Sequence, residues 1–162
     1  MCAGVPRIGR LVVVGVGLVG GSFALGLKAA GRVDTVVGVG RGRANLDAAV
    51  TLGIIDRAMM IDADWTRELA DADLVLLATP VAQFPALFEA MAGRLPPQAV
   101  LTDAGSTKQN AIAAARQHLG AALPRFVPGH PIAGTEHTGA AAAFATLYRD
   151  RNVVLTPLPE TD

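Results

Sequence analysis

Short apolar runs alternate along the chain with segments whose apolar residues recur at helical spacing. In residues 83–91, for example, Phe84, Leu87, Phe88 and Met91 stand on one helical face. The pattern predicts strands at residues 11–14, 35–39, 57–61, 74–78, 99–102, 126–127 and 153–155, and helices at residues 18–30, 44–52, 83–91 and 107–119. Nearly continuous apolar strands separated by helices are typical of a parallel sheet covered on both faces. The pattern therefore predicts an α/β fold with a doubly wound, mainly parallel sheet.

The composition agrees with one packed domain spanning residues 1–162. Hydrophobic residues make up 51% of the 162 residues and charged residues 17%. Basic and acidic residues number 14 each, so the formal charge is zero and gives no sign of a nucleic-acid partner. Cys2 is the only cysteine, which excludes an intrachain disulfide, predicts no metal site built on thiolates and favours the cytoplasm.

The uncharged segment at residues 11–27 follows two arginines, as in a signal peptide, but five glycines interrupt it. The rest of the chain has no apolar stretch long enough to span a bilayer, so no membrane partner is expected.

Three of those glycines have the spacing of a phosphate-binding loop. Gly15, Gly17 and Gly20 follow a predicted strand and open a predicted helix. Gly15 permits a tight turn, Gly17 lets the backbone approach a pyrophosphate, and Gly20 lets the helix pack closely on the strand. The helix begins at Leu18 and Val19, where free N–H groups and the positive end of the helix dipole favour phosphates. A Rossmann-type site for a nicotinamide dinucleotide is therefore predicted here.

The end of the second strand bears on which dinucleotide binds. Sites selective for NAD usually carry an acid there, which bonds the ribose 2′-hydroxyl. In this sequence Gly40 stands at that position, and Arg41 and Arg43 follow. No carboxylate would repel a 2′-phosphate, and two guanidinium groups are suited to bind it. The residues favour NADP; in the alternative interpretation both arginines are solvated and NAD is still accepted.

Two further loops follow strands, at the edge of the sheet where ligands bind. Thr79 and Pro80 follow the strand at residues 74–78 and are predicted near the nicotinamide ribose, unless they form an ordinary turn. Ser106 and Lys108 follow the strand at residues 99–102 and offer a hydroxyl and a positive charge. Ser106 or Thr107 also suits the N-cap of the next helix, a role compatible with ligand binding.

A loop expected after residues 126–127 contains the candidate base. His130 lies between Gly129 and Pro131, which suits an imidazole directed into a cleft. A dehydrogenase that oxidises an alcohol needs a base for the hydroxyl proton, and imidazole serves near neutral pH. His118 and His137 are instead predicted to be surface residues.

Taken together, the motifs are specific. Four motifs follow one another along the chain, at residues 15–22, 78–80, 102–108 and 129–136. The chain resembles the N-terminal domain of the prephenate/arogenate dehydrogenase family of tyrosine biosynthesis along essentially its whole length. The resemblance implies oxidative decarboxylation of prephenate or arogenate, with His130 taking the proton of the 4-hydroxyl. It further implies that Ser106 orients His130 and contacts nicotinamide or substrate, and that Thr135 and Glu136 lie at the substrate.

Two departures qualify what the resemblance implies. The family usually carries an acid where Gly40 stands. The family also has a second, helical domain, which forms a homodimer and supplies an arginine for the substrate carboxylate, and no counterpart follows Asp162. We therefore expect a cofactor-binding half with little or no turnover alone. The alternatives are the cofactor domain of a β-hydroxy-acid dehydrogenase and a non-catalytic dinucleotide-binding module.

Overall fold

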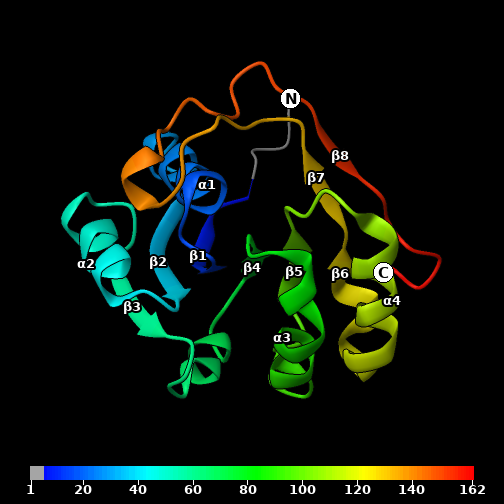
Figure 1. The fold of residues 1–162 in the computed structure, drawn as a ribbon. Coiled ribbons are helices and arrows are strands. Elements are labelled where there is room, and N and C mark those ends of the chain that lie inside the picture. Colours follow the sequence, from blue (N-terminus) through cyan, green and yellow to red (C-terminus); the bar gives the residue numbers. More distant parts are fainter. Residues whose placement is uncertain (1–5) are drawn as a thin grey trace.

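The computed structural model describes residues 6–162, so the predictions that rest on Cys2 fall outside the described residues. Within this range, six parallel strands form a sheet in the order β3-β2-β1-β4-β5-β6 (Figure 1). The strands are β1 (Ile8–Val14), β2 (Val33–Gly40), β3 (Arg57–Met60), β4 (Leu74–Leu77), β5 (Val100–Asp103) and β6 (Phe126–Val127). The α-helices are α1 (Leu18–Ala29), α2 (Arg43–Thr51), α3 (Phe84–Met91) and α4 (Lys108–His118). The predicted doubly wound fold is confirmed.

The central strand β1 is apolar at successive positions because both faces of the sheet are covered. Leu11 and Val13 belong to the core beneath α1 and α2, whereas Val12 and Val14 belong to the core beneath α3 and α4. All four are fully buried. A strand with only one covered face would alternate apolar and polar residues instead. The unbroken apolar run in the sequence is thus a direct consequence of two helical layers.

The strand and helix predictions are confirmed, with ends that shift by one to three residues at most positions. The helix predicted from residue 83 begins with a single 3-10 turn (Val81–Gln83), and α3 proper begins at Phe84. None of the helices formed by residues 6–162 combines the length and the apolar character that a membrane crossing requires.

One prediction about the end of the chain is wrong. The residues after β6 were expected to form a loop, but Gly129–Pro131 form a strand, β7, which pairs antiparallel with β8 (Val153–Leu155). His130 lies opposite Val154 in this pair. A three-residue segment with glycine at one end and proline at the other has no strand pattern of its own. It becomes a strand because β8 returns beside it.

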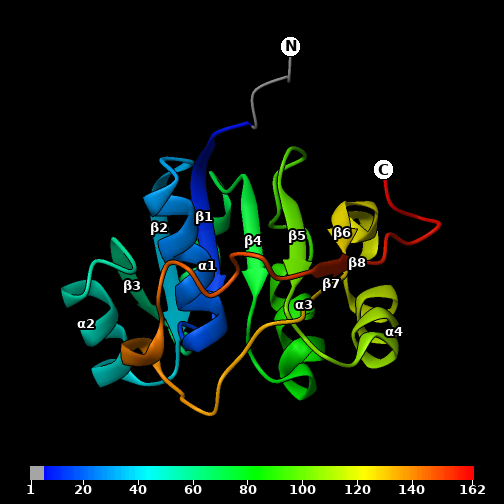
Figure 2. The ribbon, with the colours of Figure 1, turned by 90° about the horizontal axis from the view of Figure 1, so that it is seen from above.

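Residues 139–148, which we call the return segment, cross α1 (Figure 2). The backbone N–H of Phe144 donates to the buried hydroxyl of Ser22 at 3.0 Å, and the hydroxyl of Tyr148 donates to the carbonyl of Val19 at 3.0 Å. A Cβ added to Gly21 would lie 2.8 Å from the Cβ of Ala143. The return segment therefore packs against α1 and holds in place the helix that follows the phosphate loop.

Replacing Tyr148 with phenylalanine is expected to lower the free energy of unfolding by about 1 kcal/mol, the usual net contribution of one hydrogen bond. The ring stays in place, because it packs edge-to-face on Phe23 at 5.8 Å between centroids. Burial raises the pKa of the Tyr148 hydroxyl, so this group remains a donor across the ordinary pH range. Urea unfolding followed by fluorescence of the buried Trp65 measures the change. Unchanged stability would show that the hydrogen bond does not hold the return segment.

Candidate dinucleotide site

The turn after β1 is built on two glycines that have no room for a side chain. Gly15 has φ +99°, and a Cβ on it would lie 2.6 Å from the carbonyl oxygen of Ala78. A Cβ on Gly20 would collide with the carbonyl oxygen of Gly15 and would lie 2.8 Å from Cγ1 of Val13. The predicted structural tasks of Gly15 and Gly20 are confirmed: the first permits the turn, and the second brings α1 against its strand.

Gly17 differs from these two glycines because its side-chain direction is open. It is the N-cap residue of α1 with extended backbone, φ −116° and ψ −155°, and beyond its two chain neighbours no described atom lies within 4 Å of a Cβ placed on it. Among the described residues no side chain caps α1, and its first turn holds no acidic residue. The first N–H groups of a helix have no intrahelical acceptor, and the helix dipole adds positive potential there. This open, uncapped helix end fits an anion such as a pyrophosphate.

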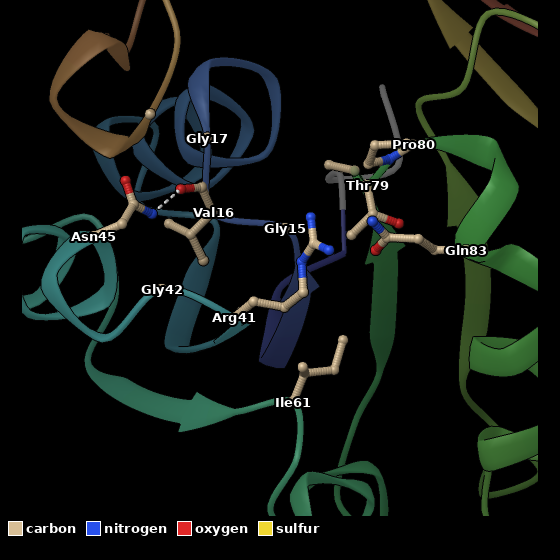
Figure 3. Close-up of a pocket in the computed structure, with 13 residues that line it drawn as sticks. Gly15, Val16, Gly17, Arg41, Gly42, Asn45, Ile61, Thr79, Pro80 and Gln83 are labelled. Carbon is tan, nitrogen blue, oxygen red and sulfur yellow. Dashed lines mark hydrogen bonds between the residues drawn. The ribbon is translucent and has the colours of Figure 1, made fainter.

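A pocket of about 330 Å³ lies at the carboxyl ends of β1, β2 and β4, directly beside this helix end (Figure 3). It contains residues from the phosphate loop, from the end of β2 and from the loop after β4, but none from residues 102–108 or 129–136. Those predicted as cofactor contacts that line it are Gly15, Gly17, Gly40, Arg41, Thr79 and Pro80. The predicted contacts that do not line it are Leu18, Val19, Gly20, Arg43 and Ser106. Leu18 is buried in the protein interior, which leaves its backbone N–H as the only group it can present at the helix end.

The pocket is suited in size and polarity to part of a dinucleotide. A neighbouring hollow of about 460 Å³ shares Arg41, Ile61 and Gln83 with it, so the two together form an extended surface. The Oγ1 atom of Thr79 is buried and has no hydrogen-bond partner within the described part of the chain. An unpaired buried hydroxyl at the edge of a pocket is a group that a bound molecule can satisfy.

Asn45 lines the pocket but carried no signal in the sequence. Its Nδ2 donates to the carbonyl of Val16 at 2.7 Å, and its Oδ1 accepts the N–H of Ala140 at 2.8 Å. One amide thus joins the phosphate loop, α2 and the return segment, which also places Gly139 in the pocket wall. Asparagine is common near the start of a helix, so the sequence does not single out Asn45. Its role is evident only from the tertiary structure, which places Ala140 beside it.

The two arginines after β2 have different positions. The Arg41 side chain points into the pocket, toward the side formed by Gly15 and Thr79 (Figure 3). Arg43 instead forms an ion pair with Asp47 at 3.1 Å on the exposed side of α2. A Cβ on Gly40 would lie 3.4 Å from Cδ2 of Leu46, an ordinary contact. The site therefore has one guanidinium and no carboxylate at the end of β2.

Ser106 and His130 lie on neighbouring elements and are not joined by a hydrogen bond within residues 6–162. Ser106 is exposed on the loop between β5 and α4, and His130 is half-buried on β7. The carboxylate of Asp103 connects their backbones: it accepts the N–H of Gly105 at 2.9 Å and the N–H of Gly129 at 3.1 Å. Thr107 occupies the N-cap position of α4 without a side-chain capping bond, so the capping role predicted for Ser106 or Thr107 is not made by either hydroxyl.

Thr135 and Glu136 lie away from the pocket. Both are exposed and line an open hollow together with His137 and Phe144. The Oγ1 atom of Thr135 accepts the backbone N–H of His137 at 3.2 Å, which shapes the local turn. The structure therefore does not bring these two predicted substrate residues to the dinucleotide pocket.

Comparison with known proteins gives the family. Residues 23–162 match the family described as "Prephenate dehydrogenase, nucleotide-binding domain". The chain belongs to this family. The matched region begins just after the phosphate loop, so the geometry around Gly17 is an independent indication of nucleotide binding.

Relatives of this family agree with the assignment along nearly the whole chain. The prephenate dehydrogenase of Bacillus subtilis is 35% identical over 94% of this chain and 40% of its own length. The cyclohexadienyl dehydrogenase of Zymomonas mobilis is 36% identical over 91% of this chain and 49% of its own length. The crystal structure of prephenate dehydrogenase from A. aeolicus, in complex with hydroxyphenyl propionate and NAD+, has a TM-score of 0.85 and 35% identity. This structure covers 95% of this chain, which in turn spans 52% of that protein. The chain thus spans about half the length of these dehydrogenases or less.

Proposed function

We propose that this chain is the cofactor-binding half of an enzyme that oxidises and decarboxylates prephenate or arogenate with a nicotinamide dinucleotide. The observation that carries the proposal is the open N-terminus of α1 at Gly17, facing a pocket at the carboxyl edge of the sheet. Membership of the prephenate dehydrogenase nucleotide-binding family supports the substrate class. The remaining substrate contacts are expected from a part of the enzyme outside residues 1–162.

Different residues of the chain have different roles in such a reaction. The first turn of α1 binds the pyrophosphate, and Thr79 and Pro80 lie beside the adjoining ribose. The nicotinamide, when bound, supplies the acceptor for the hydride that leaves the ring carbon bearing the hydroxyl. His130 accepts the hydroxyl proton, and Ser106 orients the imidazole and contacts nicotinamide or substrate. Loss of carbon dioxide makes the ring aromatic, so the protein mainly has to position the reactants.

Absorbance of the reduced nicotinamide tests this proposal. The full-length protein is expected to reduce the dinucleotide with prephenate or arogenate and not with β-hydroxy acids. The isolated chain is expected to bind the dinucleotide with little or no turnover. Oxidation of a β-hydroxy acid with no reaction on either cyclohexadienyl substrate would overturn the proposal. The homodimer expected from the resemblance is tested by size-exclusion chromatography of the full-length protein. The cytoplasmic location stays a prediction.

We also propose that the site prefers NADP to NAD. Arg41 points into the pocket where a 2′-phosphate would lie at the end of β2, and Gly40 leaves no carboxylate to repel it. Contacts between guanidinium and phosphate are strong because both groups are charged. One such contact accounts for the preference, since Arg43 is paired with Asp47 outside the pocket.

Replacing Arg41 with alanine is expected to weaken NADPH binding about tenfold, a loss of ~1.4 kcal/mol, and to leave NADH binding unchanged. Arg43→Ala is the matched control: it removes the same charge two residues along, and the NADPH affinity is expected to stay within twofold. Isothermal titration calorimetry of each variant with NADPH and with NADH measures the affinities. Equal NADPH affinity in Arg41→Ala and the unmodified protein would refute the assigned role of Arg41.

A further inference from the structure

We propose that Asp103 and Lys108 form a positioning pair that sets the backbone from which His130 and Ser106 project. The inference rests on the proposed function for its catalytic consequence, whereas its structural part stands on the hydrogen bonds alone. Neither residue lines the dinucleotide pocket.

Asp103 ends β5, and its side chain is completely buried. Its Oδ2 accepts the N–H of Gly105 at 2.9 Å, and its Oδ1 accepts the N–H of Gly129 at 3.1 Å. Gly105 directly precedes Ser106, and Gly129 directly precedes His130. One carboxylate therefore binds the peptide groups that lead into both predicted site residues, although these lie on different elements.

Lys108 completes the arrangement through a second set of contacts. It is the first residue of α4, and its side chain, 17% exposed, turns back to pair with the Oδ2 atom of Asp103. The same ammonium group donates to the carbonyl oxygen of Gly129. Gly129 is thus held at its N–H by Asp103 and at its carbonyl by Lys108. A residue fixed at both peptide groups can neither rotate nor slide, so the direction of the next residue, His130, is set.

The packing around Gly129 shows why this control is needed. A Cβ on Gly129 would lie 2.7 Å from the carbonyl oxygen of Asp103 and 3.1 Å from Oγ1 of Thr102. β7 therefore begins in direct contact with the end of β5, where it has three residues and a single partner strand. So short a pairing defines position weakly, whereas a buried ion pair with directed hydrogen bonds defines it sharply. Buried ion pairs add little net stability, which favours a role in geometry.

Glu68 provides a matched comparison. Its side chain is also buried, 4% exposed, and it pairs with Arg57 at 2.9 Å and with Arg10 at 3.7 Å. These contacts join side chains and hold no peptide group next to a predicted site residue. A change at Glu68 therefore disturbs a buried charge of the same kind without releasing β7.

The experiment uses the full-length enzyme with Asp103→Asn, Lys108→Met, Lys108→Arg and the double variant Asp103→Asn/Lys108→Met, beside Glu68→Gln. Each single neutral variant leaves one buried charge without its partner and can fail to fold for that reason. The double variant removes both charges and avoids this problem. In the double variant and in Lys108→Met, kcat is expected to fall between about 10- and 100-fold, as for a misplaced reacting group. The dinucleotide Kd is expected to stay within twofold. Lys108→Arg keeps the charge and the donors, and is expected to recover most of kcat.

Amide hydrogen exchange gives a readout that does not depend on turnover. Exchange of the Gly129 and His130 N–H groups is expected to become at least tenfold faster in the double variant and to stay unchanged in Glu68→Gln. Unchanged kcat or unchanged exchange in the double variant overturns the positioning role, as does an equal fall of kcat in Glu68→Gln. If the unmodified enzyme oxidises neither prephenate nor arogenate, the proposed function fails, and the exchange rates alone decide whether the pair positions β7.

Discussion

Replacing His130 with asparagine is expected to lower kcat for prephenate or arogenate oxidation about 1000-fold, within the range for loss of a general base. Asparagine keeps a polar side chain of similar reach but cannot accept and carry the hydroxyl proton. The backbone is expected to stay in place, because Gly129 is bound to Asp103 and His130 lies opposite Val154 in the β7–β8 pair. The dinucleotide Kd is therefore expected to stay within twofold.

Steady-state kinetics of the full-length enzyme, with dinucleotide titration in parallel, measures both quantities. His137→Asn is the control, since this exposed histidine lies seven residues along the same chain segment and outside the dinucleotide pocket. Its kcat is expected to match that of the unmodified enzyme. A hydride step that is unimpaired in His130→Asn would remove His130 as the base and favour a base supplied from elsewhere, as in β-hydroxy-acid dehydrogenases.

Replacing Gly17 with aspartate is expected to weaken binding of either dinucleotide more than 100-fold without destabilising the fold. The position is open, with extended backbone, so the side chain meets no described atom on entry. Its carboxylate would stand where the pyrophosphate binds. Two like charges 4 Å apart repel by about 4 kcal/mol at an effective dielectric constant of about 20. A 100-fold change corresponds to ~2.7 kcal/mol, so the repulsion is large enough.

The same substitution is expected to keep or slightly raise the free energy of unfolding, because aspartate at an N-cap stabilises a helix by a few tenths of a kcal/mol relative to glycine. Gly17→Asn is the control: it caps the helix without charge and is expected to weaken binding far less. Dinucleotide titration and thermal unfolding of the two variants separate the effects. Loss of stability in Gly17→Asp, or binding equal to that of Gly17→Asn, would contradict the assigned pyrophosphate site.

Local patterns in the sequence were enough for the fold and for the phosphate loop. The apolar run at Leu11–Val14 requires a strand covered on both faces, whichever helices supply the cover. The spacing of Gly15 and Gly20 is also a local pattern, although the close contacts of Gly15 are with Ala78 and Thr79, which follow β4 and lie far away in the sequence. The ends of the elements shifted by a few residues because apolar periodicity marks the buried middle of an element, whereas its ends fray and carry no such pattern.

The arrangement of the site around that loop depends on residues far apart in the sequence. Arg43 pairs with Asp47 one helical turn along α2, a spacing that the sequence already contains, whereas only the tertiary structure puts Arg41 into the pocket. Asn45 acts through Ala140, and Asp103 acts through Gly129, each after the chain has returned to it. A hydrogen bond between distant residues leaves no periodic signal in either segment. The sequence by itself therefore determined the sheet, its helices and the phosphate loop, whereas the tertiary structure decided which residues surround it and how β7 presents His130.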